Sequence, residues 1–224
     1  MKKYELTSKV TEYQSHTLHR IKALKDFGSV KEGQFGGWIE SEENLSQADN
    51  AWVYNNAKVF DKARVYGDAA VSDDAKVCGY AMVHDNARVY GNAEVSDYVE
   101  VFENAIVFGH AKVYGFTRIF GNAIVLGNAI LFGHAKVYGK ATINGDAKVY
   151  DAADYIVFKN FWSSERYFTW TRSNNKWSVG CFHGTGEELI KKAYADSEKS
   201  GREYERVVRY VESILADEKK EKSN

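Results

Sequence analysis

The sequence predicts an all-β solenoid, in which short strands wind into stacked coils, with a different segment at each end. Three observations predict it. From Val53 to Val149 every sixth residue is Val, Ile or Leu. The residue two positions before each of these is Ala, with Val99 and Thr117 as the exceptions. Nothing interrupts the repeat between residues 51 and 153, and a short unbroken period is the signature of a repeat architecture.

Each six-residue unit alternates as a short strand does. Ala, the residue after it and the aliphatic residue point in, out and in. Gly, Asp, Asn or His then follow, and these types tolerate the positive φ of a turn. A strand of this length cannot bury its apolar side alone, so we expect three strands to close a triangular coil of eighteen residues. Val71 should then lie between Val53 and Val89, in a parallel β-helix of about six coils that occupies residues 51–154.

Composition narrows the class of protein. The chain has 224 residues and a formal net charge of −1, which indicates no basic surface for nucleic acid. Two cysteines, Cys78 and Cys181, favour a reducing compartment over a disulfide framework. The first residues lack the apolar core of a signal peptide, and no apolar run is long enough to span a membrane. The sequence therefore predicts a cytoplasmic protein.

Residues 1–50 lie outside the repeat and are predicted to form an N-terminal β cap. Strands are expected at Lys3–Leu6, Lys9–Tyr13 and Thr17–Leu24. A cap is needed because the open end of a solenoid exposes unpaired backbone and the interior column. His16 and His19 have no Cys or carboxylate at metal-ligand spacing, so no metal site is predicted there.

One face of the predicted prism is apolar. Two faces carry charge along their centres, whereas the face that contains Ile106 and Ile124 has only Arg88 at its centre. Together with Phe108 and Leu126, the two isoleucines form a patch that soluble monomers seldom leave in water. The predicted contact face consists of Trp52, Tyr54, Arg88, Tyr90, Ile106, Phe108, Ile124 and Leu126.

Three kinds of cover for this face remain open. Further copies of the chain could cover it in a trimer or a dimer. The chain's own C-terminal segment could fold over it, or a foreign protein could bind there. The sequence does not decide among them.

Residues 155–224 should form a small α+β unit. Tyr155–Phe158 is apolar, and Arg166–Arg172 with Lys176–Phe182 predicts a hairpin around residues 173–175. A capping box at Thr185 and Glu188 begins one helix, and a second helix is expected after a break at Gly201. The aromatic residues Trp162, Trp170 and Trp177 are expected in the core of this unit, and the tail from residue 217 is expected to fray.

The repeat resembles the hexapeptide-repeat proteins of the left-handed parallel β-helix class. Units such as NARVYG and NAKVFD carry the resemblance over residues 51–153. The flanking stretches HRIKALKDFGSVKEGQFGGWIESEENLS and WSVGCFHGTGEEL resemble phage- and prophage-encoded members of unassigned role. This resemblance implies left-handed coils and a mobile-element origin, and it transfers no catalytic residue.

An enzyme is the alternative hypothesis. Many left-handed β-helix proteins are acyltransferases that use a histidine as general base on acyl-CoA held between protomers. The candidates are His84, His110 and His134. However, Asn and His both tolerate turn positions, and the repeat extends no long loop to shape a site. These histidines also lack the close pair that a zinc site needs, so we predict no metal centre.

The sequence thus favours a non-catalytic protein-binding or scaffold protein that acts through the contact face and self-associates. A phage-encoded protein of this kind could block a host factor. Neither a cofactor nor a nucleic-acid partner is predicted. Ice binding is excluded because it needs ranks of outward threonine, and Thr142 is essentially alone.

Overall fold

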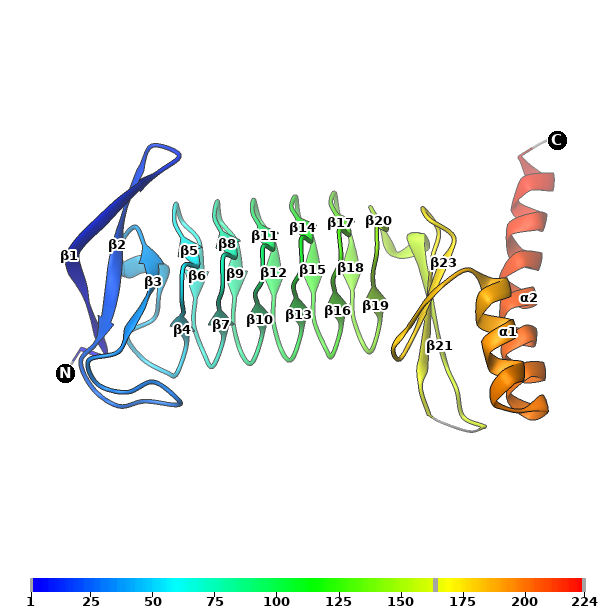
Figure 1. Cartoon of the computed structure of the whole chain (residues 1–224). Coiled ribbons are helices and arrows are strands. Elements are labelled where there is room, and N and C mark those ends of the chain that lie inside the picture. Colours follow the sequence, from blue (N-terminus) through cyan, green and yellow to red (C-terminus); the bar gives the residue numbers. More distant parts are fainter. Residues whose placement is uncertain (1, 163–164, 223–224) are drawn as a thin grey trace. The chain divides into compact units, whose positions relative to one another are not determined.

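The computed structural model describes residues 2–162 and 165–222 (Figure 1). The chain divides into two compact units, Met1–Asp154 and Tyr155–Asn224. The first unit holds the solenoid and the strands before it. The second holds a small sheet and two helices.

The solenoid is a parallel β-helix of about six coils, as predicted. Each of the first five coils contributes one two-residue strand to each of three sheets, and the last contributes a strand to two of them. The first sheet contains β4 (Trp52–Val53), β7 (Ala70–Val71), β10 (Arg88–Val89), β13 (Ile106–Val107), β16 (Ile124–Val125) and β19 (Thr142–Ile143). The second contains β5 (Lys58–Val59), β8 (Lys76–Val77), β11 (Glu94–Val95), β14 (Lys112–Val113), β17 (Ile130–Leu131) and β20 (Lys148–Val149). The third contains β6 (Arg64–Val65), β9 (Met82–Val83), β12 (Glu100–Val101), β15 (Arg118–Ile119) and β18 (Lys136–Val137).

The eighteen-residue register confirms the predicted stacking. Val71 pairs with Val53 on one side and with Val89 on the other, and all three are fully buried. Acidic side chains at the turns add a link between coils. The carboxylate of Asp97, which has a φ of +59°, accepts a hydrogen bond from the Gly115 N–H one coil later at 2.8 Å. Aliphatic columns therefore fill the interior, and hydrogen bonds from turn backbone to turn carboxylates link the corners of successive coils.

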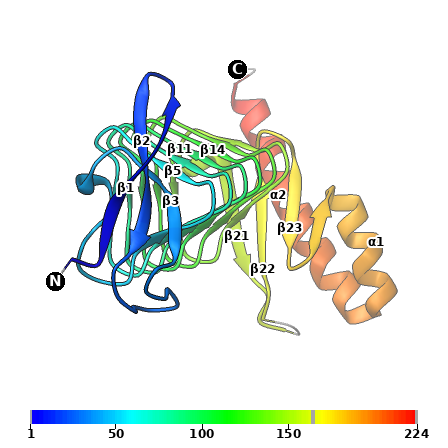
Figure 2. The ribbon, with the colours of Figure 1, turned by 60° about the vertical axis from the view of Figure 1, so that its left-hand side comes forward.

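Three strands precede the solenoid. They are β1 (Tyr4–Tyr13), β2 (His16–Ala23) and β3 (Phe35–Ile39), followed by the short helix η1 (Glu42–Asn44). The two separate strands predicted at Lys3–Leu6 and Lys9–Tyr13 form the single strand β1. A register shift between Leu6 and Val10 lets β1 stay paired with β2 along its length. β3 pairs in parallel with β5, so the hairpin extends the second sheet over the first coil (Figure 2).

The second unit contains a four-stranded antiparallel sheet. Its strands are β21 (Tyr155–Lys159), β22 (Tyr167–Thr171), β23 (Lys176–Val179) and β24 (Phe182–Gly184), and the 3-10 helix η2 (Ala152–Asp154) ends the first unit. The pair Thr171 and Lys176 confirms the predicted hairpin. The single strand expected over Lys176–Phe182 is wrong, since Gly180 has a φ of +57° and turns the chain into β24.

Two helices follow, α1 (Gly186–Asp196) and α2 (Glu198–Glu221). The capping box predicted at Thr185 and Glu188 is confirmed. The predicted break at Gly201 is wrong. Ser197 separates the helices and caps α2, while Gly201 is buried inside α2, where the Tyr194 ring leaves no room for a side chain.

The tail is more ordered than expected. α2 continues to Glu221, and Arg172 donates two hydrogen bonds, of 2.7 and 3.1 Å, to the Glu218 carboxylate. The remaining tail residues 223–224 lie outside the described residues. Trp170 and Trp177 are buried in the core of this unit, and Trp162 is partly buried against it, as predicted. None of the helices described is both long and apolar enough to cross a membrane.

Candidate functional site

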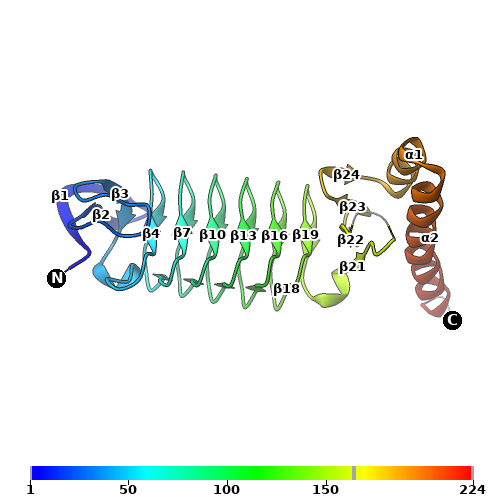
Figure 3. The ribbon, with the colours of Figure 1, turned by 90° about the horizontal axis from the view of Figure 1, so that it is seen from below.

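The predicted contact face corresponds to the first sheet. Figure 3 shows its strands side by side, in a row from β4 to β19 along the solenoid. Ile106 pairs with Ile124 across β13 and β16, and both side chains point outward because the next residue on each strand, Val107 or Val125, points into the core. The alternation of the strand thus places an aliphatic column on the surface.

The structure corrects the prediction that Trp52 belongs to the contact face. Its position in the repeat points outward, but its side chain is fully buried. The ring of Tyr4 lies 5.9 Å from it and that of Phe27 lies 5.3 Å from it, both edge-on. The N-terminal segment therefore covers the first coil here, and Trp52 belongs to the cap interface instead of the exposed face.

The other seven predicted residues lie on the surface of this sheet. Six of them are half-buried, and Arg88 is exposed; the six are Tyr54, Tyr90, Ile106, Phe108, Ile124 and Leu126. Neighbouring coils cover part of each side chain. The rings of Tyr90 and Phe108 stack with centroids 4.8 Å apart and planes 11° apart. This arrangement forms a continuous half-buried surface, called here the apolar face.

A groove opens at the N-terminal end of the apolar face. Its volume is about 590 Å³, and Tyr54, Ser72, Arg88, Tyr90 and Ile106 are among its lining residues. Ser72 is small, so the groove floor is low between the two tyrosines. On the side of the cap, the hydroxyl groups of Ser29 and Tyr54 are 3.1 Å apart. Position in the repeat predicts which face each of these solenoid residues lies on, but it does not predict the depression.

The candidate catalytic histidines are not brought together. His84 follows the third sheet, His110 lies at a turn after the first sheet, and His134 lies at a turn after the second. His84 is stacked between Tyr66 and Phe102, at 4.7 and 5.2 Å. The described residues thus supply no assembled group for the acyltransferase hypothesis.

Both ring nitrogens of His84 already face acids. Its Nε2 lies 3.3 Å from a carboxylate oxygen of Glu100, and its Nδ1 lies 3.4 Å from one of Asp85. A general base needs a nitrogen that can reach a substrate proton. The surroundings of His84 fit a structural role in the surface of the solenoid.

Stacked aromatic columns account for many surface rings. One runs along the third sheet, with centroids 4.7–5.3 Å apart, and consists of Tyr66, His84, Phe102, Phe120 and Tyr138. A second runs along a neighbouring corner, with centroids 4.9–5.3 Å apart, and consists of Tyr80, Tyr98, Phe116 and His134. Neither column was predicted from the sequence. The eighteen-residue spacing of aromatic positions could have revealed both.

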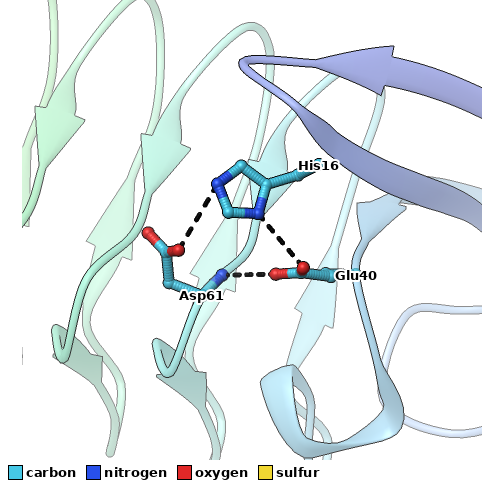
Figure 4. Close-up of side chains that lie close together, drawn as sticks. All are labelled: His16, Glu40 and Asp61. Carbon is cyan, nitrogen blue, oxygen red and sulfur yellow. Dashed lines mark hydrogen bonds and ion pairs between the residues drawn. The ribbon is translucent and has the colours of Figure 1, made fainter.

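A cluster that the sequence did not predict lies at the hairpin tip (Figure 4). His16 Nδ1 is 3.1 Å from a carboxylate oxygen of Glu40, and its Nε2 is 3.4 Å from one of Asp61. The Asp61 N–H donates to the other Glu40 oxygen at 2.7 Å. These residues belong to β2, the segment after β3 and the first coil, so only tertiary folding brings them together.

This cluster fits an ion pair better than a metal site. A metal site needs several ligand atoms close together. In the described part of the chain, His16, Glu40 and Asp61 meet this distance requirement, because one ligand atom from each lies within 4.8 Å of the others. However, the two carboxylates meet different ring nitrogens, so the imidazole separates them. The hydrogen bond to Glu40 raises the pKa of His16. Burial alone would raise the pKa of Glu40, but the hydrogen bonds from His16 and the Asp61 N–H lower it on balance.

These shifts give the hairpin tip a pH dependence. Because the folded pKa of His16 lies above 6.5, its stabilisation is fully present below pH 6.5 and is lost as the pH rises through the folded pKa. We expect the amides of residues 13–19 to exchange faster at pH 8 than at pH 6.5, after correction for intrinsic rates. Hydrogen exchange by mass spectrometry measures this change.

The control for that experiment lies on the same strand. His16→Gln should abolish the pH dependence of exchange, whereas His19→Gln should keep it, because His19 Nδ1 faces the Thr7 carbonyl at 3.3 Å instead of a carboxylate. Equal pH profiles for wild type and His16→Gln would show that the ion pair does not hold the tip.

Comparison with known proteins adds no identification. No protein-family model matches the chain, and no curated protein sequence matches it significantly.

Proposed function

We propose that this chain is a non-catalytic binding or scaffold protein that acts through the apolar face and self-associates as a trimer or a dimer. The observation that carries the proposal is the row of half-buried apolar side chains Ile106, Phe108, Ile124 and Leu126 on the outer surface of the first sheet. Soluble monomers seldom expose contiguous apolar patches of this kind.

Several features support this proposal beyond the apolar residues. Arg88 is the one charged side chain along the centre of the face, and interface centres are depleted in charge but often include Arg and aromatic anchors. The short strands leave the face regular and rigid, so little conformational entropy opposes association. A host protein is the other partner that such a face could bind.

The proposed setting follows from the sequence. The hexapeptide repeat and its flanking stretches resemble phage-encoded proteins of the left-handed β-helix class, which supports a mobile-element origin and a host factor as target. Cys78 and Cys181 are both free, which supports a reducing compartment such as the cytoplasm.

Light scattering on the full chain tests the proposal. The wild-type mass should be two or three times that of the 25.3 kDa chain. The double variant Ile106→Glu with Ile124→Glu should fall to the mass of one chain, because two buried carboxylates per subunit oppose the contact. The matched control is Ile130→Glu, which places the same charge at a half-buried outward position of the second sheet.

Four outcomes are informative. Dissociation by the double variant but not by the control supports the apolar face as the contact. Equal effects of both variants would place the contact elsewhere. A wild-type monomer would contradict self-association, and a wild-type monomer that the double variant unfolds would assign the face to intramolecular cover.

A further inference from the structure

The aromatic column on the apolar face has a gap. In order along the solenoid, the residues that follow the strands of the first sheet are Tyr54, Ser72, Tyr90, Phe108, Leu126 and Asn144. Trp52, Ala70 and Arg88 pair in register, so Ser72 lies between Tyr54 and Tyr90. The second position of the column therefore has no ring, although its neighbours on both sides are tyrosines.

The spacing of the gap fits one planar ring. Strands of adjacent coils are about 4.8 Å apart, so the two tyrosine positions are separated by about 9.6 Å. Elsewhere on the solenoid, stacked rings one coil apart have centroids 4.7–5.3 Å apart, and Tyr90 stacks on Phe108 at 4.8 Å. A ring above Ser72 would therefore lie at stacking distance from both tyrosines.

The gap opens into the groove. Its volume of about 590 Å³ lies within the range of small-molecule sites, and Ala70 and Ser72 line it with small side chains. Both of these residues are half-buried in the structure. A ring that entered the gap would thus meet the Tyr54 and Tyr90 rings on its faces and a low floor beneath it.

The charged residues around the groove indicate what charge a bound aromatic molecule should have. Arg88 lies on the same strand as Tyr90, and among the residues that the structure describes its exposed guanidinium makes no ion pair. Asp68 also lines the groove, with its carboxylate accepting a 2.7 Å hydrogen bond from Asn50. An anion would find a donor in Arg88, but a second negative charge would meet Asp68.

A second break, on the second sheet, offers a contrast. There Cys78 and Ser96 interrupt the column between Phe60 and Tyr114. The hairpin tip covers the Phe60 end, where the Tyr13 ring packs edge-on against Phe60 at 5.6 Å. The chain thus supplies its own ring beside that break, whereas the gap above Ser72 opens into a groove.

We propose that the gap between Tyr54 and Tyr90 binds a planar aromatic ring that has a single negative charge close to it in the same molecule. The ring stacks between the two tyrosines above Ser72, and Arg88 binds the anion. An aromatic carboxylate has this chemistry, either as a free small molecule or as the C-terminal aromatic residue of a protein. The site shares Tyr54, Arg88 and Tyr90 with the proposed contact face, and its groove is open in the single chain.

Calorimetric titration of the full chain with N-acetyl-L-phenylalanine tests this site. Two relatives of the probe separate its features. N-acetyl-L-phenylalaninamide keeps the ring and lacks the charge, and N-acetyl-L-cyclohexylalanine keeps the charge and lacks the planar ring. We expect saturable binding of the first compound and binding about tenfold weaker or worse for both relatives.

Variants locate the binding. Ser72→Tyr fills the gap with the chain's own ring and should abolish binding, whereas Ser96→Tyr makes the same change on the second sheet and should leave it intact. Arg88→Gln should weaken binding about tenfold while leaving the gap open. This variant alters only an exposed side chain, so it tests the site even where Ser72→Tyr fails to fold.

Two peptides distinguish a protein C-terminus from a free small molecule as the source of the ring. A peptide that ends in phenylalanine with a free carboxylate should bind more tightly than the free acid when a protein terminus is the ligand, and its C-terminal amide should not bind. Equal affinity for peptide and free acid assigns a small molecule.

Absence of saturable probe binding, or unchanged binding to Ser72→Tyr, overturns the site. Neither result bears on self-association, which the masses of the Ile106 and Ile124 variants decide separately.

Discussion

Trp52→Ala should lower the free energy of unfolding by about 3–5 kcal/mol, the range for deletion of a fully buried large aromatic side chain. The ring is completely buried, and Tyr4 and Phe27 pack edge-on against it. Its removal leaves a cavity between the N-terminal cap and the first coil. Because an uncapped solenoid exposes backbone and core together, the loss should spread from this end. Urea unfolding followed by circular dichroism measures it.

Trp38→Ala is the matched control. Trp38 belongs to the same cap but is half-buried, with the Arg20 guanidinium 5.1 Å from its ring centre. Exposed cation–π contacts contribute about 0.5–1 kcal/mol, so we expect a loss near 1 kcal/mol. Equal losses for the two variants would contradict the assignment of Trp52 to the cap interface.

Gly121→Ala should destabilise the solenoid by about 2–5 kcal/mol. Gly121 has a φ of +74°, which costs an L-residue about 1–2 kcal/mol. A Cβ there would also lie 2.8 Å from the Gly139 backbone nitrogen one coil later. This collision adds about 1–3 kcal/mol, the usual cost of overpacking. Chemical unfolding of the full chain gives the total.

Gly139→Ala separates the two contributions. Gly139 has a similar φ of +69°, but nothing lies within 4 Å of its Cβ position. Only the conformational cost of about 1–2 kcal/mol should remain. If both variants lost the same free energy, the distance between coils would not limit the size of the turn residue.

The solenoid was predictable because its information is local and repeated. Each unit carries its own strand and turn, and the unbroken period fixes the register of every coil. The stacking of Val53, Val71 and Val89 follows from that period alone. The capping box of α1 was predictable for the same reason, since Thr185 and Glu188 act within one turn of helix. In contrast, the prediction for Gly201 was wrong because its role depends on the packing of α2 against the Tyr194 ring of α1.

The repeat alone specifies the solenoid, its three faces and the apolar character of one of them, because side-chain direction in a strand follows from position in the repeat. Tertiary structure decided what lies on top of those faces. It buried Trp52 beneath the cap, and it brought His16 to Glu40 and Asp61 at the hairpin tip. It also left the gap above Ser72 open into a groove. These features join residues far apart in the chain, and no local period encodes how a non-repeating segment packs on a repeating one.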